Sequence, residues 1–574
     1  MSDALTSPTP EGDARGWGRP LVVVALLAWV AGIALTTRSA LNGDVTYTLG
    51  GLRTAGLAGF AVQDIFVARP VAYRFFMAGL DGVRAVFVPV TGTFAGETII
   101  RLSADLVVVA VCAVAFAGLR RHVGRRLAAV SAFAAATALT LAPPWHFLQP
   151  DWLGVVLSVL AVGAALWPRR WWLGALAGGL CVMAVVAVKL ATAPWAAMAL
   201  VVIFLLDRRR AVATAVSGGL LVGVWAGLMN VLLPWENIWL SDQVTLVQQS
   251  PLNRGLRLSD LTKLALHVVE TAVVSPVVMT LPVSAAALVA SRTSRRSRWW
   301  TAAAVVVLGA LSVASGFGQG EGLMYHFVGA PVFAAILAGV AFVRVPRARM
   351  PLVLSAVVAG AAGLALMAMP ADWRLDHRAT AAAVCLGVAL AGIVLVAFAT
   401  RRGSPRRPLR LGAGAVPSLG AAVLCAVLAV SSMPTATYAY SVYDYQITVG
   451  AVRLRRAAAA EVRDAIGADT PVLYFTFGSV GYSIGNPTPC RYPSPQWLQR
   501  SVTIDAVTRM RSFADNLECL SSDTTAQYLI IDSTWFTLDQ APAIVRERVD
   551  ELFDCSAEAR LTFAWRSLVA CPRR

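Results

Sequence analysis

Long apolar segments separated by short basic loops run through most of this 574-residue chain and limit what it can fold into. A helix needs about 17–25 mostly apolar residues to cross a bilayer. About thirteen such segments can be placed, at 20–37, 97–118, 127–143, 152–167, 172–188, 192–206, 211–233, 265–290, 299–316, 323–343, 350–369, 379–399 and 411–431. Charged residues make up only 14% of the chain, whereas soluble domains carry about 25%. The sequence therefore predicts a polytopic α-helical membrane protein with a transmembrane domain over 20–431.

The basic residues gather in every second loop and predict how the chain is oriented. Six such loops lie at 120–126, 169–170, 208–210, 292–298, 344–349 and 401–410. By the positive-inside rule, these loops and the N-terminal tail, 1–19, face the cytoplasm. The loop 38–96 and the polar segment after 432 are then external. The net charge of +17 belongs largely to these loops, so it does not indicate a nucleic-acid partner.

The polar segment 432–574 predicts a small extracytoplasmic α/β domain. Its predicted elements are one helix and three β runs, at 449–466, 472–477, 527–532 and 560–570. The Gly/Pro-rich segment 478–495 is predicted to be a loop. Four cysteines in this domain predict two disulfides with three possible pairings: Cys490, Cys519, Cys555 and Cys571. We expect the domain to be a scaffold or an acceptor-binding module rather than the place of the chemistry.

The loop 38–96 contains two carboxylates in an informative position. Asp44 follows the first apolar segment by a few residues, and Asp64 lies further along the same loop. At the outer bilayer surface, a carboxylate can take a proton from an acceptor hydroxyl. The alternative is that Asp44 only caps the helix that follows it. After Pro70 the apolar pattern predicts an amphipathic helix in the membrane interface.

This loop resembles that of the GT-C superfamily of polyprenyl-phosphate-sugar-dependent glycosyltransferases. Members carry an acidic residue in the first external loop just after the first span, and Asp44 matches that position. A second acidic residue often follows in a G–aromatic–x–D–aromatic…P stretch, which 59–66 with Arg69 and Pro70 resembles. The match is incomplete, because many relatives have two prolines where this chain has one. The general plan of spans, carboxylate loop and external domain covers the whole chain.

Polar residues at the predicted outer ends of other spans are similar to those of bacterial members. The residues that the resemblance assigns to substrate binding are Gln149, Asp151, Glu321, Tyr325 and His326. The cations that topology places at the external surface, as candidates for binding a donor phosphate, are Arg69, Lys189, Arg254, Arg257 and Lys263. A lysine that snorkels to the interface is an equal interpretation of Lys189. Each histidine, taken singly, also fits a structural role.

The resemblance implies transfer of a hexosyl or pentosyl group from a polyprenyl-phosphate donor. The acceptor is a hydroxyl of an envelope glycan, lipid or protein at the external face of the plasma membrane. Asp44 is then the general base of a direct, inverting displacement. Asp64 orients the acceptor or holds a divalent cation such as Mg²⁺ or Mn²⁺; no cofactor or metal ligand set is recognisable. The Arg-, Ala- and Val-rich composition is compatible with a high-GC actinobacterium.

Two other classes of function fit a chain with many spans. The first is a transporter or flippase of envelope precursors, although the sequence shows no internal repeat and no matching pair of broken spans. The second is a non-catalytic scaffold for envelope assembly. The enzyme requires a carboxylate at Asp44, and the other two classes do not.

Overall fold

The computed structural model describes residues 19–89, 92–249, 260–319, 323–401, 415–433, 449–565 and 567–574. The chain divides into two compact units, each with its own apolar core. The helical unit takes in Met1–Ser39, Asp105–Val222 and Leu256–Gln446. The sheet unit takes in Ala40–Ala104, Gly223–Gly255 and Ile447–Arg574. The loop with Asp44 and the C-terminal domain therefore belong to one compact unit, although more than half of the sequence separates them.

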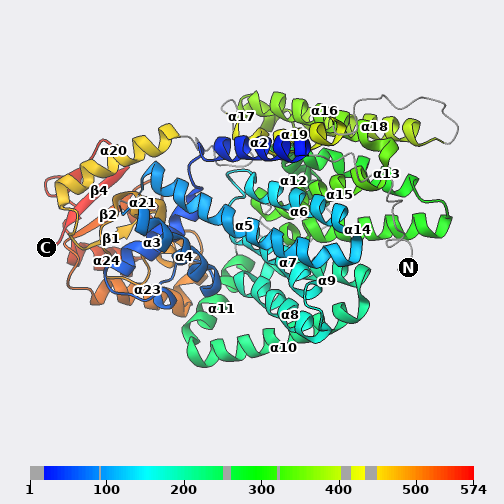
Figure 1. The fold of residues 1–574 in the computed structure, drawn as a ribbon. Helices are drawn as coiled ribbons and strands as arrows, with labels where there is room; N and C mark the ends of the chain where they lie inside the picture. The colour runs from blue at the N-terminus through cyan, green and yellow to red at the C-terminus, as the bar shows by residue number, and fades with distance from the viewer. Residues whose placement is uncertain are drawn as a thin grey trace. The chain divides into compact units, whose positions relative to one another are not determined.

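The helical unit consists of long apolar helices joined by short connections (Figure 1). Its helices are α2 (Arg19–Thr36), α6 (Arg125–Thr140), α7 (Pro150–Leu166), α8 (Trp171–Val188), η3 (Leu190–Thr192), α9 (Ala193–Leu206), α12 (Asp260–Val274), η4 (Pro276–Thr280), α13 (Leu281–Ala290), α14 (Arg295–Gly318), η5 (Met324–Phe327), α15 (Gly329–Arg344), η6 (Pro346–Ala348), α16 (Arg349–Ala368), α17 (Ala371–Asp376), α18 (Arg378–Thr400), α19 (Ala415–Leu428) and η7 (Val430–Ser432). Two further helices have residues in both units, α5 (Phe94–Val123) and α10 (Arg208–Leu232).

Each predicted apolar segment overlaps a helix of the structure. Among the described residues, seven helices are long and apolar enough to cross a membrane, and one bent pair meets the same criterion. Other apolar helices are shorter, such as α7 and α9. The chain is thus a helical membrane protein, and the number of thirteen spans stays a prediction.

The predicted span 265–290 is broken. Ala265–Val274 and Pro276–Ala290 meet at an angle of 111°. Pro276 lacks the amide hydrogen that would continue the helix, and a proline disfavours helical backbone at the residue before it. Ser275 accordingly leaves the helical region, with φ −125° and ψ 82°.

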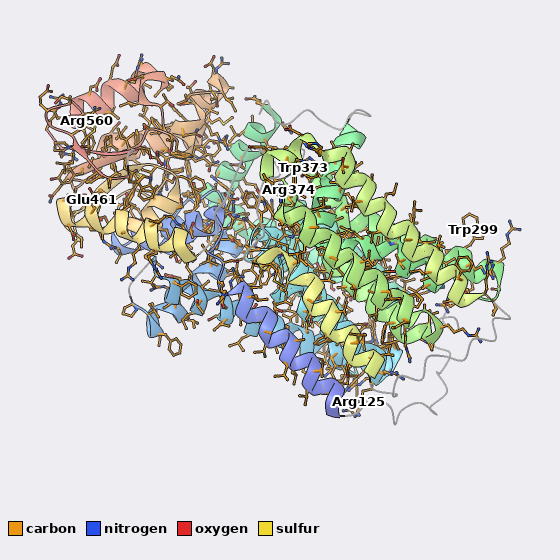
Figure 2. All side chains as sticks on the ribbon, turned by 90° about the horizontal axis from the view of Figure 1, so that it is seen from above. Arg125, Trp299, Trp373, Arg374, Glu461 and Arg560 are labelled. Atoms are coloured by element: carbon orange, nitrogen blue, oxygen red, sulfur yellow. A yellow bond between two sulfur atoms is a disulfide. The ribbon has the colours of Figure 1, made fainter. Side chains whose placement is uncertain are left out.

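Loops predicted to lie on opposite sides of the membrane lie at opposite ends of the helices of this unit. In Figure 2, Arg125 and Trp299, beside two predicted cytoplasmic loops, lie toward one end. Trp373 and Arg374, from the loop 370–378 that the alternation of basic loops places outside, lie toward the other. This arrangement is the one that the alternation of basic loops predicts.

The sheet unit surrounds a small mixed sheet. Its elements are α3 (Gly43–Leu57), η2 (Val62–Asp64), α4 (Val71–Phe87), α11 (Pro234–Gln249), α20 (Val449–Ile466), β1 (Val472–Phe475), α21 (Gly478–Ile484), α22 (Gln496–Arg500), η8 (Asp505–Arg509), α23 (Arg511–Ser522), β2 (Tyr528–Asp532), η9 (Leu538–Gln540), α24 (Ala543–Leu552), β3 (Leu561–Thr562) and β4 (Leu568–Pro572).

The strands lie in the order β1-β2-β4-β3, with β1 and β2 parallel and the other pairs antiparallel. Alternate residues of β1 face opposite sides, as the twofold period of a strand requires. Val472 and Tyr474 pack with α20, whereas Leu473 and Phe475 pack with α23 and α24 (Figure 1).

Most predicted elements of this domain are confirmed. The disulfides are also confirmed, and their pairing is Cys490–Cys519 and Cys555–Cys571. Two predictions were wrong in detail. The β run 560–570 is a hairpin of β3 and β4, and the predicted loop 478–495 begins with the helix α21.

Candidate functional site

Asp44 lies in the first turn of α3, which starts a few residues after α2 ends. The N-cap of α3 is Asn42, whose side-chain oxygen accepts a hydrogen bond of 2.7 Å from the backbone N–H of Asp44. The interpretation of Asp44 as the helix cap is therefore wrong, because Asn42 has that role. The side chain of Asp44 is 30% exposed, so its carboxylate is within reach of another molecule.

The charged partner of Asp44 is Arg69. Arg69 Nη2 lies 3.4 Å from Asp44 Oδ2, and Arg69 Nη1 donates a hydrogen bond of 2.9 Å to the carbonyl of Ala68. Ala68 has a φ of 54°, a left-handed conformation that costs a non-glycine residue about 1–2 kcal/mol. The segment after η2 thus holds an unfavourable backbone conformation where it presents Arg69 to the carboxylate.

Buried ion pairs fix the elements on either side of this segment. Arg74, in the first turn of α4, donates hydrogen bonds to the Ile65 carbonyl and to Glu236 of α11. Glu236 also accepts a hydrogen bond of 2.8 Å from the Val71 N–H. Burial raises the pKa of Glu236, against the opposing charge of Arg74. No local sequence pattern points to Glu236, since its partners lie about 165 residues earlier in the chain.

A second bridge joins α3 to α4. Arg53 Nη2 lies 2.6 Å from Asp81 Oδ1, and Arg84 Nε lies 2.7 Å from the same oxygen. Burial alone would raise the pKa of Asp81, but the hydrogen bond from Arg84 and the charge of Arg53 outweigh it, so this pKa is lowered. The helix predicted after Pro70 is confirmed as α4, and its place in the membrane interface stays a prediction; the two arginines fasten α4 to α3 through Asp81.

In the helical unit, a second group of polar residues surrounds Asp151. This residue is fully buried and lies in the first turn of α7. The helix dipole favours a negative charge at that end of a helix. Its carboxylate accepts hydrogen bonds from Lys189 Nζ at 2.9 Å, Gln319 Nε2 at 3.0 Å and Ser315 Oγ at 3.3 Å. Nδ1 of His326 lies 3.3 Å from the same carboxylate. A buried carboxylate needs such partners, because an unpaired charge is costly away from water.

Lys189 stands at the edge of this group. It is the C-cap residue of α8, its side chain is 26% exposed, and its ammonium lies 5.9 Å from the centre of the Tyr325 ring. Tyr325 in turn contacts the ring of His326, with ring centres 4.2 Å apart. The structure therefore brings together Asp151, Lys189, Tyr325 and His326, which the sequence analysis had singled out separately.

The chain was compared with known proteins as a sequence and as a structure. No protein-family model and no curated protein matches it. Its structure is similar to that of ArnT from Cupriavidus metallidurans bound to undecaprenyl phosphate, with 17% identity, a TM-score of 0.53 and 98% of each chain covered. The apo state of the same protein gives 16% identity and a TM-score of 0.51, over 97% of this chain and 98% of that one. The chain has the GT-C fold.

A GT-C fold confirms the resemblance drawn from Asp44 and the stretch 59–70 at the level of architecture. A weaker likeness, with a TM-score of 0.40 and 12% identity, exists to the oligosaccharyltransferase of Archaeoglobus fulgidus, over 95% of this chain and 74% of that one. At these identities the likeness concerns the fold alone, so the roles of individual residues stay predictions.

Of the other predicted site residues, the structure describes the side chains of two, Gln149 and Asp64. Gln149 is buried and is the N-cap residue of α7. Asp64 ends η2 and is exposed. Arg254, Arg257 and Glu321 lie outside the described part of the chain. Lys263 lies in α12, but its side chain is outside the described part as well.

Each of the two loop carboxylates interacts electrostatically with an arginine. The charged neighbour of Asp44 is Arg69, and the charge of Asp64 acts on Arg74. Within the described residues, no three His, Cys, Asp or Glu side chains gather as metal ligands.

Proposed function

We propose that this protein is a glycosyltransferase that moves a sugar from a polyprenyl-phosphate-linked donor to a hydroxyl acceptor at the external face of the plasma membrane. The observation that carries the proposal is a partly exposed carboxylate, Asp44, held beside Arg69 at the start of α3 in a chain with the GT-C fold. ArnT, with the same fold, has been crystallised with undecaprenyl phosphate, which is a polyprenyl phosphate. Acceptors of this reaction are hydroxyls of envelope glycans, lipids or proteins.

Asp44 acts as the general base in the proposed reaction. The acceptor hydroxyl oxygen attacks the anomeric carbon of the donor while its proton passes to the Asp44 carboxylate. The bond between that carbon and the phosphate oxygen breaks, and the polyprenyl phosphate leaves with the electron pair. One displacement of this kind inverts the configuration at the anomeric carbon.

Arg69 has two roles in this proposal. Its guanidinium lies 3.4 Å from Asp44 and orients it, and a guanidinium is also the kind of group that binds a phosphate through its planar set of N–H donors. A cation beside the leaving phosphate stabilises the charge that develops there. Lys189, Arg254, Arg257 and Lys263 remain further candidates for this contact. Asp64 orients the acceptor, and it is also the residue that would hold a divalent cation.

The orientation proposed for the chain follows from the basic loops. The N-terminus lies in the cytoplasm, and the sheet unit, with its disulfides, lies outside, where disulfides persist. Nucleotide sugars are not available on that side, so a lipid-linked donor fits the location.

The first test compares wild type and Asp44→Asn in membranes supplied with radiolabelled polyprenyl-phosphate sugars. Asparagine keeps the shape of the side chain but cannot accept the proton, so we expect transfer to fall about a hundredfold or more. Asp464→Asn, at an exposed position of α20, is the matched control and should retain full transfer. The anomeric configuration of the product, read by NMR, tests inversion.

Other results would point elsewhere. Equal transfer by wild type and Asp44→Asn would show that Asp44 is not the base, and Asp64→Asn would be the next variant. If wild type transfers no sugar from any donor, the enzyme proposal fails and a transporter or an assembly scaffold takes its place.

A further inference from the structure

The helix that carries Asp44 crosses a helix of the C-terminal domain at very short range. A Cβ added at Gly50 of α3 would lie 2.5 Å from the carbonyl oxygen of Gly478, in α21. A Cβ added at Gly478 would lie 2.7 Å from the ring of Tyr47 and 2.9 Å from its carbonyl oxygen. Each helix therefore has a glycine in the tight contact between α3 and α21, which Figure 1 draws beside each other. Any side chain at either position would push the helices apart.

Further contacts follow along two turns of α3. The ring of Tyr47 packs against Phe477 with centres 5.0 Å apart, and the guanidinium of Arg53 lies 5.0 Å from the centre of the Tyr482 ring. At the end of this face, the N–H of Thr488 donates a hydrogen bond of 3.0 Å to the carbonyl of Thr54. The C-terminal domain thus contacts α3 from Tyr47, one turn beyond Asp44, to Thr54.

The segment that leads to Arg69 is held by the same domain. The N–H of Phe66 donates a hydrogen bond of 2.8 Å to the carbonyl of Arg491, and the Phe66 ring stacks on that of Tyr492 at 5.4 Å. Arg491 follows Cys490, and the disulfide between Cys490 and Cys519 joins the segment 490–492 to α23. Both members of the Asp44–Arg69 pair therefore lie on chain segments that the C-terminal domain holds.

We infer that the C-terminal domain is the positioning element of the candidate active site, with Gly50 and Gly478 as positioning residues. The inference rests on the proposed function for its effect on sugar transfer. It gives the domain a role beyond that of a scaffold or an acceptor-binding module. The close crossing sets the axial position of α3, and hence the place of the carboxylate one turn before the contact. Misplacing a reacting group by about 1 Å can cost a hundredfold in rate.

The test uses full-length protein with Gly50→Ala, Gly478→Ala and the matched control Gly56→Ala. Gly56 lies on the same helix, is exposed, and has no atom within 4 Å of an added Cβ. We expect kcat to fall roughly tenfold to a hundredfold in the first two variants. KM for the donor should stay within about twofold, because the donor contacts themselves are unchanged. Gly56→Ala should match wild type.

A second readout does not depend on turnover. The thiol introduced by Asp44→Cys is labelled with a membrane-impermeant maleimide in each glycine background. The native cysteines outside the disulfides are Cys112, Cys181, Cys385 and Cys425, all buried or half-buried in the helical unit, and they give the background rate. We expect the labelling rate to change at least threefold with Gly50→Ala and Gly478→Ala and to stay constant with Gly56→Ala.

Each result decides the inference. Equal labelling rates in all backgrounds would overturn it, and so would changed labelling with an unaltered kcat. If wild type transfers no sugar, the proposed function fails, while labelling still decides whether the domain positions residue 44. If neither glycine variant folds, Phe477→Leu removes only the ring contact with Tyr47, and the same two shifts are expected at smaller size.

Discussion

At the scale of single residues, Asp151 shows what the sequence could and could not tell. The resemblance assigns it to substrate binding, from its place at the predicted outer end of an apolar segment. Its partners could not be predicted, because Ser315, Gln319 and His326 lie 164 to 175 residues away. A weak signal existed in Ser315 and Gln319, two polar residues one turn apart at the end of the apolar helix α14.

Asp151→Asn should destabilise the helical unit. The change removes the charge that pairs with Lys189 but keeps the size of the side chain. Breaking a buried ion pair costs about 3–5 kcal/mol, and the partial exposure of Lys189 favours the lower end. Thermal unfolding in lipid nanodiscs measures the loss. The double variant Asp151→Asn/Lys189→Gln should lose less than the two single variants together, and strictly additive losses would contradict the pairing.

At the scale of elements, local periodicity predicted the apolar helices and most of the α/β domain, whereas features set by a neighbouring element escaped it. The helix α21 has glycines at Gly478 and Gly481, which lower helix propensity, so its sequence is typical of a loop. The glycine at 478 is required by the crossing with α3, a contact that no local pattern shows. Pro276 marks the break in the sequence, but the apolar pattern on both sides of it predicts one continuous span.

The break in the helical unit also packs closely against a neighbour. A Cβ added at Gly363 of α16 would overlap the ring of Pro276, so Gly363→Ala should destabilise the unit by about 1–3 kcal/mol through overpacking. Gly387→Ala, at an exposed site of α18 with no atom near an added Cβ, is the control. There alanine should be neutral or stabilise by up to about 1 kcal/mol. Melting temperatures of the two variants in one detergent compare the effects, and equal values would show that Gly363 has room.

At the scale of the whole molecule, cysteine content and loop charge predicted an external disulfide-bonded domain, and the disulfides are present. The sequence placed the loop 38–96 with the transmembrane domain, however, whereas the compact unit of the structure joins it to the C-terminal domain. Sequence patterns report which segments are apolar, but not which distant segments share a core. The core of the sheet unit includes Phe66, Trp239 and Trp497, from three separate stretches of chain.

Reduction of the disulfides should affect this unit first. The bonds join residues 29 and 16 positions apart, and closing loops of such lengths stabilises a fold by about 3 kcal/mol each. With dithiothreitol, hydrogen exchange should rise in β1, β2 and α3 while α15 stays protected. Cys490→Ala/Cys519→Ala should reproduce the increase without reductant. Unchanged exchange in α3 would show that the disulfides do not support the Asp44 helix.

The order of synthesis gives the crossing of α3 and α21 a further meaning. Ribosomes add about 5–20 residues per second. Gly478 is made about 420 residues after the end of α3, so α3 exists for roughly 20–80 s before α21 is available to pack against it. During that interval every span between the two is inserted. A nascent chain halted before α21 therefore exposes a carboxylate loop that lacks its contacts with the C-terminal domain. Competence for the proposed sugar transfer would arise late, once the predicted membrane spans are already in the bilayer.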